Sequence, residues 1–247
     1  MPLENSERPH PPSNPKQGSL HSSERIQSFF SEISSRYDFA NHLLSGGCDF
    51  YWRWRAARLV KAWSPAQILD LASGSGDLAL ALERACPNAR LVATDFCEPM
   101  LLKAKDKNVR GLVVADGQKL PFPDNTFDAL TIGFGLRNMT SWPAALAEFK
   151  RVLRPGGHLL ILDFSQPRAF FGQIYRWYLN NILPRVAAYV TGHKGAYTYL
   201  ADSIAAFPPP ETLSLLLEES GYSEVTATPL TGRIVAIHTA VKRTGLE

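Results

Sequence analysis

Short apolar runs alternate with longer amphipathic stretches through most of the chain. The runs are rich in Leu, Ile and Val and are bounded by turn residues, which is typical of buried strands. They cover residues 68–71, 91–95, 112–115, 127–134 and 158–164. The stretches between them carry apolar residues at helical spacing and predict helices over 77–86, 99–105 and 143–153. This alternation predicts a mostly parallel sheet with helices on both faces, an α/β fold of the Rossmann-like kind.

The two flanks of this alternation have a different pattern. Residues 1–22 are rich in Pro, Ser and charge, and we expect a disordered tail. Residues 23–63 mix aromatic and charged residues at helical spacing, which predicts an N-terminal helical cap on a single domain, 23–247. After strand five we expect a helical insertion over 172–206. A helix at 210–219 and closing strands at 224–229 and 233–241 complete a seven-stranded sheet.

The composition is that of an ordinary globular domain, with 45% hydrophobic and 20% charged residues. The formal net charge is only +3, so we expect no nucleic-acid partner. Three separated cysteines indicate neither a disulfide framework nor a metal site. No apolar run is long enough to span a membrane and the N-terminus lacks a secretion signal. We therefore expect a cytoplasmic protein.

A glycine-rich turn follows the first predicted strand directly and opens the next helix. It reads Asp70-Leu-Ala-Ser-Gly74-Ser75-Gly76, and its glycines allow a tight turn and close approach of a ligand. Asp95 ends the second strand about 19 residues later, where a carboxylate can accept hydrogen bonds from both hydroxyls of a ribose. The pattern predicts a site for an adenine-containing cofactor at Asp70, Gly74, Gly76 and Asp95.

Two cofactors fit such a turn, and later residues distinguish them. A dinucleotide fingerprint tolerates Ala79 in place of its third glycine, so that reading stays compatible. However, the third strand ends in Asp116-Gly117, where a polar side chain can reach an adenine amine and a glycine leaves room for the ring. The runs 120–128 and 154–157 that follow are typical links in methyltransferases that use S-adenosylmethionine (SAM). The whole set favours SAM.

Several motifs together resemble the ubiquinone/menaquinone biosynthesis C-methyltransferases, over about residues 34–242. The most discriminating is Phe134-Gly-Leu-Arg137-Asn138, which generic methyltransferases rarely have. The others are the stretches 35–38 with Asn41, 44–47, 162–167, 197–204 and 231–238. The chain also departs from the family pattern: the family usually has Gly-Gly-Thr-Gly where this chain has Ser73-Gly74-Ser75-Gly76. Gly133 stands where many members have Ser, Arg233 where many have a second Gly, and Asp163 replaces the usual Glu.

The resemblance implies a class I SAM-dependent methyltransferase and assigns roles to individual residues. SAM contacts fall on Ser75, Asp95, Asp116 and Gly117, with Gly133 lining the same pocket. Tyr37 would close over the cofactor from the cap. The implied reaction methylates a ring carbon of a reduced prenylated quinone, with demethylmenaquinol first. The benzoquinol of the ubiquinone pathway, or another small aromatic, is the alternative.

Carbon methylation requires a phenolate, because an adjacent hydroxyl must lose its proton before the ring carbon can attack. Arg137 follows strand four and is always protonated, so we expect it to stabilise the phenolate or orient a water rather than act as the base. His238 could titrate near neutrality, but a lone histidine in a closing strand is also a common packing residue. Both are candidate catalytic residues.

Several partners are compatible with the sequence. The aromatic residues of 172–206 predict either helix core or a channel for a prenyl tail. The cap residues Trp52 and Trp54, interleaved with arginines, are either a solvated helix face or a peripheral contact at the inner face of the membrane. A homodimer is left open. A non-catalytic SAM-binding scaffold is the alternative of another class, which the intact glycine turn and Arg137 disfavour.

Overall fold

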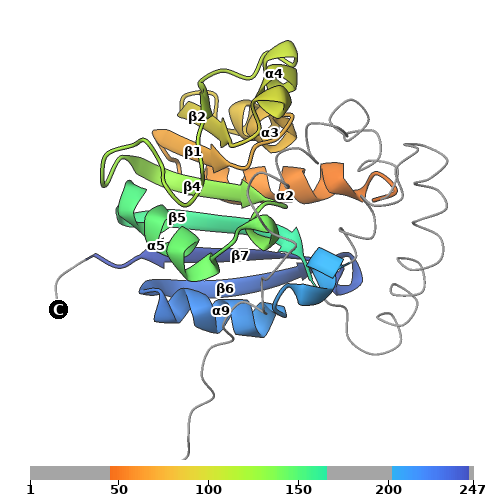
Figure 1. The fold of residues 1–247 in the computed structure, drawn as a ribbon, viewed down its shortest axis with the longest axis vertical. Coiled ribbons are helices and arrows are strands. Elements are labelled where there is room, and N and C mark those ends of the chain that lie inside the picture. Colours follow the sequence, from red (N-terminus) through yellow and green to blue (C-terminus); the bar gives the residue numbers. More distant parts are fainter. Residues whose placement is uncertain (1–44, 166–201, 245–247) are drawn as a thin grey trace, which may run out of the picture.

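The computed structural model describes residues 45–165 and 202–244, and within them the chain forms one twisted sheet flanked by helices (Figure 1). The strands are β1 (Gln67–Leu71), β2 (Arg90–Asp95), β3 (Leu112–Val114), β4 (Phe127–Gly133), β5 (Leu153–Phe164), β6 (Tyr222–Leu230) and β7 (Val235–Lys242). The helices are α2 (Cys48–Ala62), α3 (Asp77–Ala85), α4 (Glu98–Asp106), α5 (Trp142–Val152) and α9 (Pro210–Glu219). Two 3₁₀ turns, η1 (Leu136–Asn138) and η3 (Thr231–Arg233), join them.

The sheet has the order β3-β2-β1-β4-β5-β7-β6. The first five strands pair in parallel, whereas β7 is antiparallel to both β5 and β6. The predicted mostly parallel sheet of seven strands is confirmed. The strand order reverses direction between β1 and β4, and in an open parallel sheet the crevice at such a point, beyond the carboxyl ends of the strands, is where ligands bind.

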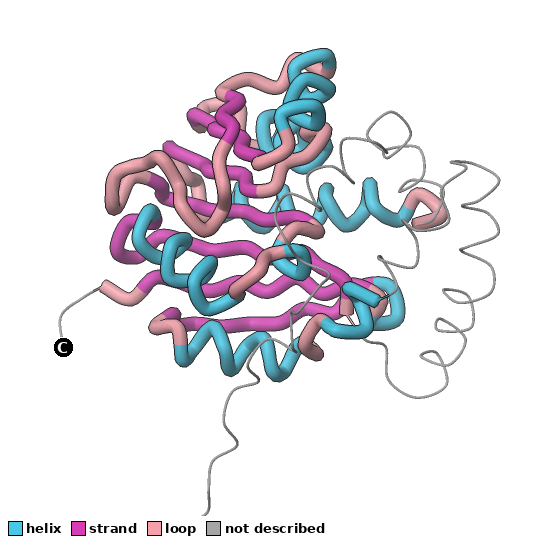
Figure 2. Tube along the Cα trace, in the orientation of Figure 1, coloured by secondary structure: helices cyan, strands magenta, loops and turns pink. Residues whose placement is uncertain are grey.

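Apolar side chains on the two faces of the sheet form two cores, as alternation along each strand requires. Leu69 and Leu71 of β1 join the cluster that α5 and α9 cover. Ile68, on the opposite face, joins the cluster that α2, α3 and Ala104 of α4 cover. Figure 2 shows the strands as a central sheet in magenta, with the helices packed beside it in cyan. The predicted arrangement with helices on both faces is therefore also confirmed.

The beginning of β5 differs from the sequence prediction. We expected Pro155-Gly156-Gly157 to end a helix and a strand to start at residue 158, yet β5 already begins at Leu153. Leu153 pairs with Phe127, and the ladder then resumes at His158 opposite Ala129. Gly156 adopts a left-handed φ of 75°, which lets the intervening residues leave the ladder and return to it. The turn predicted at Pro155-Gly156-Gly157 is present, but β5 pairs with β4 on both sides of it.

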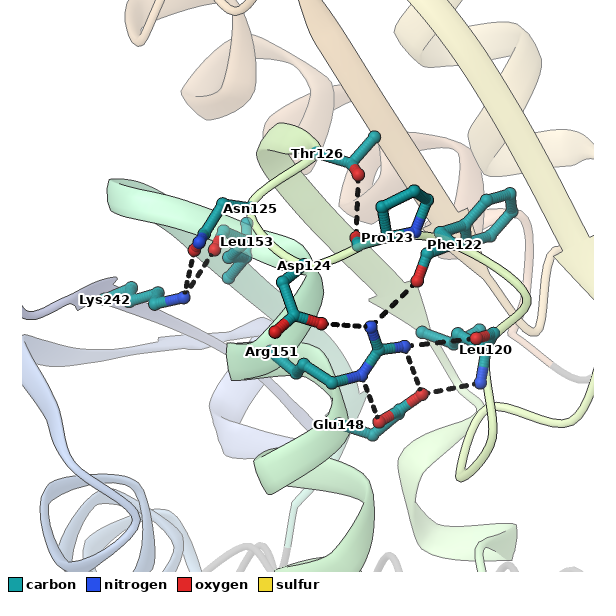
Figure 3. Close-up of polar contacts among 10 residues, drawn as sticks. All are labelled: Leu120, Phe122, Pro123, Asp124, Asn125, Thr126, Glu148, Arg151, Leu153 and Lys242. Atoms are coloured by element: carbon teal, nitrogen blue, oxygen red, sulfur yellow. Dashed lines mark hydrogen bonds and ion pairs between the residues drawn. The ribbon is translucent and has the colours of Figure 1, made fainter.

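The link from β3 to β4 is held by Arg151 of α5 (Figure 3). Its Nη1 donates to the carbonyl oxygen of Phe122 at 2.8 Å and to Asp124 Oδ1 at 2.7 Å. Its Nη2 donates to the carbonyl oxygen of Leu120 at 3.1 Å and to Glu148 Oε1 at 2.7 Å. Glu148 Oε1 in turn accepts from the Leu120 amide at 2.7 Å. One planar guanidinium thus satisfies carbonyl groups of an irregular segment that has no ladder of its own.

Several predictions fall outside the described residues: the tail at 1–22, the start of the cap with Tyr37, and most of the insertion at 172–206. Within the described part, α2 occupies the end of the predicted cap and is helical as expected. None of the helices in this part has the length and apolar character needed to cross a bilayer.

Candidate cofactor and catalytic site

The glycine-rich loop between β1 and α3 adopts a tight conformation that its sequence permits. Gly74 and Gly76 have left-handed φ angles of 56° and 84°. Gly76 caps α3, and a Cβ added there would lie 2.6 Å from Val109 Cγ2 and 2.9 Å from Ala104 Cβ. A side chain at this position would therefore be strained and would push α4 away from the loop. Helix α3 starts directly after the loop, so its first backbone amides lie beside the loop. Such a helix N-terminus is suited to polar ligands.

Asp95 fastens this loop to the end of β2. Its Oδ2 accepts from the Gly74 amide at 2.9 Å and its Oδ1 accepts from the Cys97 amide at 2.8 Å. The side chain is only 7% exposed, and burial raises its pKa. Backbone hydrogen bonds from Cys97, Gly74 and Phe96 oppose this rise, because they stabilise the ionised carboxylate. The structure thus gives Asp95 a role in shaping the loop that sequence reasoning missed, while its contact with a ribose stays a prediction.

Asp70 is the least exposed carboxylate of the site, at 0%. Its Oδ1 accepts a hydrogen bond from Thr131 Oγ1 at 2.6 Å, and among the described residues its buried Oδ2 has no hydrogen-bond partner. Burial raises the pKa of Asp70 to about 6, although Thr131 and the nearby Ser73 hydroxyl favour the ionised form. Nearby Asp95 raises this pKa further, whereas Arg53 lowers it.

The unpartnered Oδ2 atom of Asp70 allows the fit of the site to SAM to be tested. A buried carboxylate with an unused acceptor is costly unless a ligand supplies a donor or a positive charge. SAM carries both, as an α-ammonium and a sulfonium group. The left-handed glycines next to Asp70 also bring backbone close to any bound molecule. The residues present therefore fit SAM.

Asp116 and Gly117 follow β3 at the same edge of the sheet. Asp116 Oδ1 accepts from the Gln118 amide at 2.9 Å, which closes a turn. A Cβ at Gly117 would lie 2.6 Å from Met139 Cε, so this backbone packs closely against the segment after η1. Gln118 strengthens the same contact, because its Nε2 donates to Thr140 Oγ1 at 2.8 Å. Sequence reasoning did not identify Gln118.

Gly133 and Phe134 end β4 beside the glycine loop. A Cβ at Gly133 would lie 3.0 Å from Leu78 Cδ2 of α3, so the two elements are in close contact there. Phe134 has a left-handed φ of 59°, which is unusual for a bulky residue and is found at functional sites. Its ring packs against Phe164 and Trp52, with centroids 5.1 and 6.0 Å apart. The signature predicted to matter from sequence is therefore the point at which β4, β5 and α2 meet.

Arg137 forms a buried ion pair that sequence reasoning did not foresee. Its Nη1 donates to Asp163 Oδ1 at 2.9 Å, and its backbone amide donates to Asp163 Oδ2 at 3.2 Å. The two side chains are 4% and 2% exposed. Nη1 also donates to the Phe134 carbonyl, and the guanidinium lies 5.2 Å from the Phe164 ring centroid. Asp163 lies one residue before the end of β5, near the same edge of the sheet as Asp95 at the end of β2, and this position was the available signal.

His238 lies within strand β7, whereas Arg137 lies in the turn η1. It pairs in register with Ile161, and its Nε2 lies 3.1 Å from the carbonyl oxygen of Pro210 at the start of α9. Because a carbonyl only accepts, Nε2–H is the donor of that bond. Burial lowers the pKa of His238, so the ring is neutral at pH 7. Its catalytic role stays a prediction, and this hydrogen bond supports the packing alternative.

Comparisons with known proteins identify the family of this chain. The model of the ubiE/COQ5 methyltransferase family matches residues 19–242. The chain belongs to that family. Demethylmenaquinone methyltransferase of Thermus thermophilus is 47% identical over 215 residues, covering 85% of this chain and 97% of the relative. The ubiquinone/menaquinone biosynthesis C-methyltransferase UbiE of Saccharophagus degradans is 40% identical over 227 residues, covering 88% and 91%.

Solved structures support the fold of this methyltransferase. A SAM-dependent methyltransferase of Thermotoga maritima matches with a TM-score of 0.64 at 16% identity, covering 88% of this chain and all of that one. Human N-acetylserotonin methyltransferase in complex with SAM matches with a TM-score of 0.60 at 16% identity, covering 91% and 61%. The chain is therefore a SAM-dependent methyltransferase with the Rossmann-like fold predicted from its sequence.

Proposed function

We propose that this methyltransferase transfers a methyl group to a ring carbon of a reduced prenylated quinone, most of all demethylmenaquinol, to give menaquinol. The observation that carries the proposal is the relative from Thermus thermophilus, which is named a demethylmenaquinone methyltransferase and matches at 47% identity over 97% of its length. The UbiE relative supports the second candidate, the benzoquinol of the ubiquinone pathway. Another small aromatic is the third.

The cofactor would be held at the carboxyl edge of β1 to β4. The residues proposed to contact it are Asp70, Gly74, Ser75, Gly76, Asp95, Asp116, Gly117 and Gly133, together with Tyr37 outside the described residues. When bound, SAM supplies an electrophilic methyl group on a sulfonium. Asp70 places a buried negative charge beside the loop, and Asp95 keeps the loop in the shape that the ligand meets.

Arg137 and Asp163 would act on the reacting ring. A guanidinium is always protonated, so Arg137 stabilises the phenolate or orients the water that takes the proton. Asp163 is the positioning residue, since it accepts from both the side chain and the backbone of Arg137. A buried guanidinium held by the Asp163 carboxylate and the Phe134 carbonyl has few alternative conformations, so its direction is fixed. His238 stays a second catalytic candidate.

A methyl-transfer assay tests the substrate. Only the quinol has a hydroxyl to deprotonate, whereas the oxidised ring is electrophilic. The full chain should therefore methylate demethylmenaquinone with SAM when a reductant is present and form no product without one. Equal rates under both conditions would reject the phenolate mechanism. Normal SAM binding with no product from either quinol would reject the proposed substrates and direct the search to other phenols.

Location and assembly follow from the same proposal. We infer a cytoplasmic enzyme that contacts the inner face of the membrane from the aqueous side, because a polyprenyl tail keeps its quinol in the bilayer. A homodimer stays a prediction.

A further inference from the structure

Helix α2 exposes three large aromatic side chains close together. Phe50, Tyr51 and Trp54 are 62%, 48% and 49% exposed. They are three of the six large apolar residues of the described chain that are exposed to this degree. Single exposed apolar residues are ordinary, but a group on two successive helical turns marks an interaction surface.

The exposed residues form one continuous stripe along the helix. Tyr51 and Trp54 are three residues apart and stack with ring centroids 6.0 Å apart. Arg58 is four residues further, and its guanidinium lies 5.3 Å from the Trp54 ring centroid. Lys61 is exposed one turn later. Residues at these spacings share one face of a helix, so the stripe has an aromatic half and a basic half.

The opposite face of α2 is buried against the sheet. Trp52 is 3% exposed, and its Nε1 donates to Thr231 Oγ1 at 2.7 Å. This corrects the expectation that Trp52 and Trp54 belong to one surface: only Trp54 faces outward. Ala56 and Val60 continue the buried face. The helix therefore buries one apolar side and still presents aromatic rings on the other.

The charge of the stripe has one sign. Asp49 is the only acidic residue of α2, and it is 3% exposed and bound to Ser45 and Arg53. Arg58 and Lys61 thus face outward from a helix without an exposed carboxylate. Indole and phenol rings favour the boundary between lipid and water, and Arg and Lys reach anionic headgroups from the same depth. An anionic bilayer complements both halves of the stripe.

The stripe also lies on the helix that borders the candidate site. Trp52, on the buried side of α2, packs against Phe134 and Phe164 at the ends of β4 and β5. Arg53 reaches Asp77 at the start of α3 with an Nη2–Oδ2 distance of 3.7 Å. Contact of the stripe with a membrane would therefore hold the substrate edge of the sheet near the lipid.

We propose that the α2 stripe, defined as Phe50, Tyr51, Trp54, Arg58 and Lys61, docks this enzyme on an anionic membrane surface. Its purpose rests on the proposed function, because a prenylated quinol resides in the bilayer. The aromatic half enters the interfacial layer while the basic half contacts headgroup phosphates. This contact is peripheral and reversible, since few residues are buried in the lipid.

Vesicle flotation of the full chain tests the docking directly. The vesicles are phosphatidylcholine alone, or phosphatidylcholine with phosphatidylglycerol. We expect binding to anionic vesicles that weakens with salt, and little binding to neutral ones. The variants Tyr51→Ser/Trp54→Ser and Arg58→Glu/Lys61→Glu should each weaken binding about tenfold or more. The matched control, Leu102→Ser/Leu215→Ser, removes exposed apolar residues elsewhere and should bind like the original chain.

Four outcomes would overturn the docking surface. They are absence of binding to anionic vesicles, equal binding to neutral vesicles, variants that bind normally, and a control that loses binding as strongly. If the Tyr51→Ser/Trp54→Ser variant instead converts a dimer to a monomer in sedimentation velocity and vesicles are not bound, the stripe is an interface between two copies. Circular dichroism and the unfolding temperature establish that each variant is folded.

Turnover measurements separate this inference from the proposed function. With a water-soluble short-chain quinol, the stripe variants should retain the original rate. With a long-chain quinol in anionic vesicles, they should lose about tenfold in kcat/KM. Vesicle binding without turnover of either quinol would reject the proposed substrate and leave the docking surface standing.

Discussion

At the scale of single residues, the site is built on three carboxylates at the ends of strands. Asp70, Asp95 and Asp163 are each at most 7% exposed. Asp95 accepts from backbone amides and Asp163 from Arg137, so their charges are compensated. Asp70 accepts a hydrogen bond from the Thr131 hydroxyl, and its other oxygen has no partner within hydrogen-bond distance among the described residues, although the Ser73 hydroxyl is near. This difference makes Asp70 the residue whose protonation should respond to the cofactor.

Asp70→Asn should stabilise the free protein and weaken SAM binding. Folding raises the pKa of Asp70 from 3.8 to about 6, so the folded state binds the proton more tightly. Between these values stability falls as pH rises, and the cost persists above pH 6. Removing the charge should raise the free energy of unfolding at pH 8 by about 1–3 kcal/mol. Urea denaturation measures this, and an unchanged or lower midpoint would contradict it.

The pH dependence of SAM binding supplies the second half of this prediction. An ionised Asp70 attracts the cationic cofactor, so affinity should be full above pH 6 and fall as the pH drops below about 6. In Asp70→Asn this slope should disappear while Asp95 and Arg53, the charged neighbours, are unchanged. Calorimetric titration at several pH values measures the slope, and an identical slope in both proteins would refute the role.

Arg137→Ala should leave SAM affinity near normal and lower the methyl-transfer rate by about 100-fold or more, as for loss of a transition-state donor. The single variant also leaves the Asp163 carboxylate buried without its partner, which costs about 3–5 kcal/mol of stability. The double variant Arg137→Gln/Asp163→Asn should recover most of that stability but not the rate. Asp163→Glu keeps the charge and should keep most of the rate. A fast double variant, or collapse of SAM binding with the rate per bound cofactor kept, would contradict the assignment.

At the scale of elements, each strand end delivers one part of the site and the connecting segments fix its position. The β3–β4 link, residues 115–126, is the longest stretch without a helix or strand in the described parallel part of the sheet, and Arg151 binds two of its carbonyl oxygens. The hydrogen bond from Arg151 lowers the pKa of Glu148, which keeps the network ionised at neutral pH. The network is distant in sequence from the glycine loop and serves the fold.

Arg151→Lys should lower the free energy of unfolding by about 1–3 kcal/mol, because one ammonium cannot replace a guanidinium that donates to five oxygen atoms. The ion pair with Asp124 contributes little of this, since Asp124 is exposed. SAM affinity should change little. Arg90→Lys, at an exposed position, is the matched control. Unfolding curves that coincide for the original chain and Arg151→Lys would show that the network does not support the link.

At the scale of the whole molecule, the cofactor site draws on the ends of four strands, so binding should stabilise the entire domain. SAM at about 100 times its Kd should add about 2.7 kcal/mol, or roughly 5–10 °C in Tm. Asp95→Ala should weaken binding by about 1.5–3 kcal/mol, the scale of hydrogen bonds to a charged group. At the same SAM concentration its Tm shift should therefore fall below half. Asp106→Ala, at an exposed position, is the control, and equal shifts would refute the role of Asp95.

The sequence by itself determined the order of strands and helices, the glycine turn and the family. These features depend on short segments: apolar periodicity within about ten residues, the backbone freedom of Gly74 and Gly76, and the placement of Asp95 at the end of a strand. Local sterics and burial patterns act within such segments, so they can be interpreted without knowing their neighbours. The start of β5 was not predicted, because Leu153 pairs with Phe127 on the far side of a turn from the rest of the strand.

The tertiary structure alone decided what depends on contacts between distant segments. It inserted β7 between β5 and β6, and placed Asp163 against Arg137, 26 residues away. It also separated Trp52, which packs under the helix, from Trp54, which faces outward. Two residues along a helix differ by about 200° in direction, and only the position of the sheet decides which one is buried. Burial in turn sets the pKa of Asp70, so the electrostatics of the site are a property of the packed molecule.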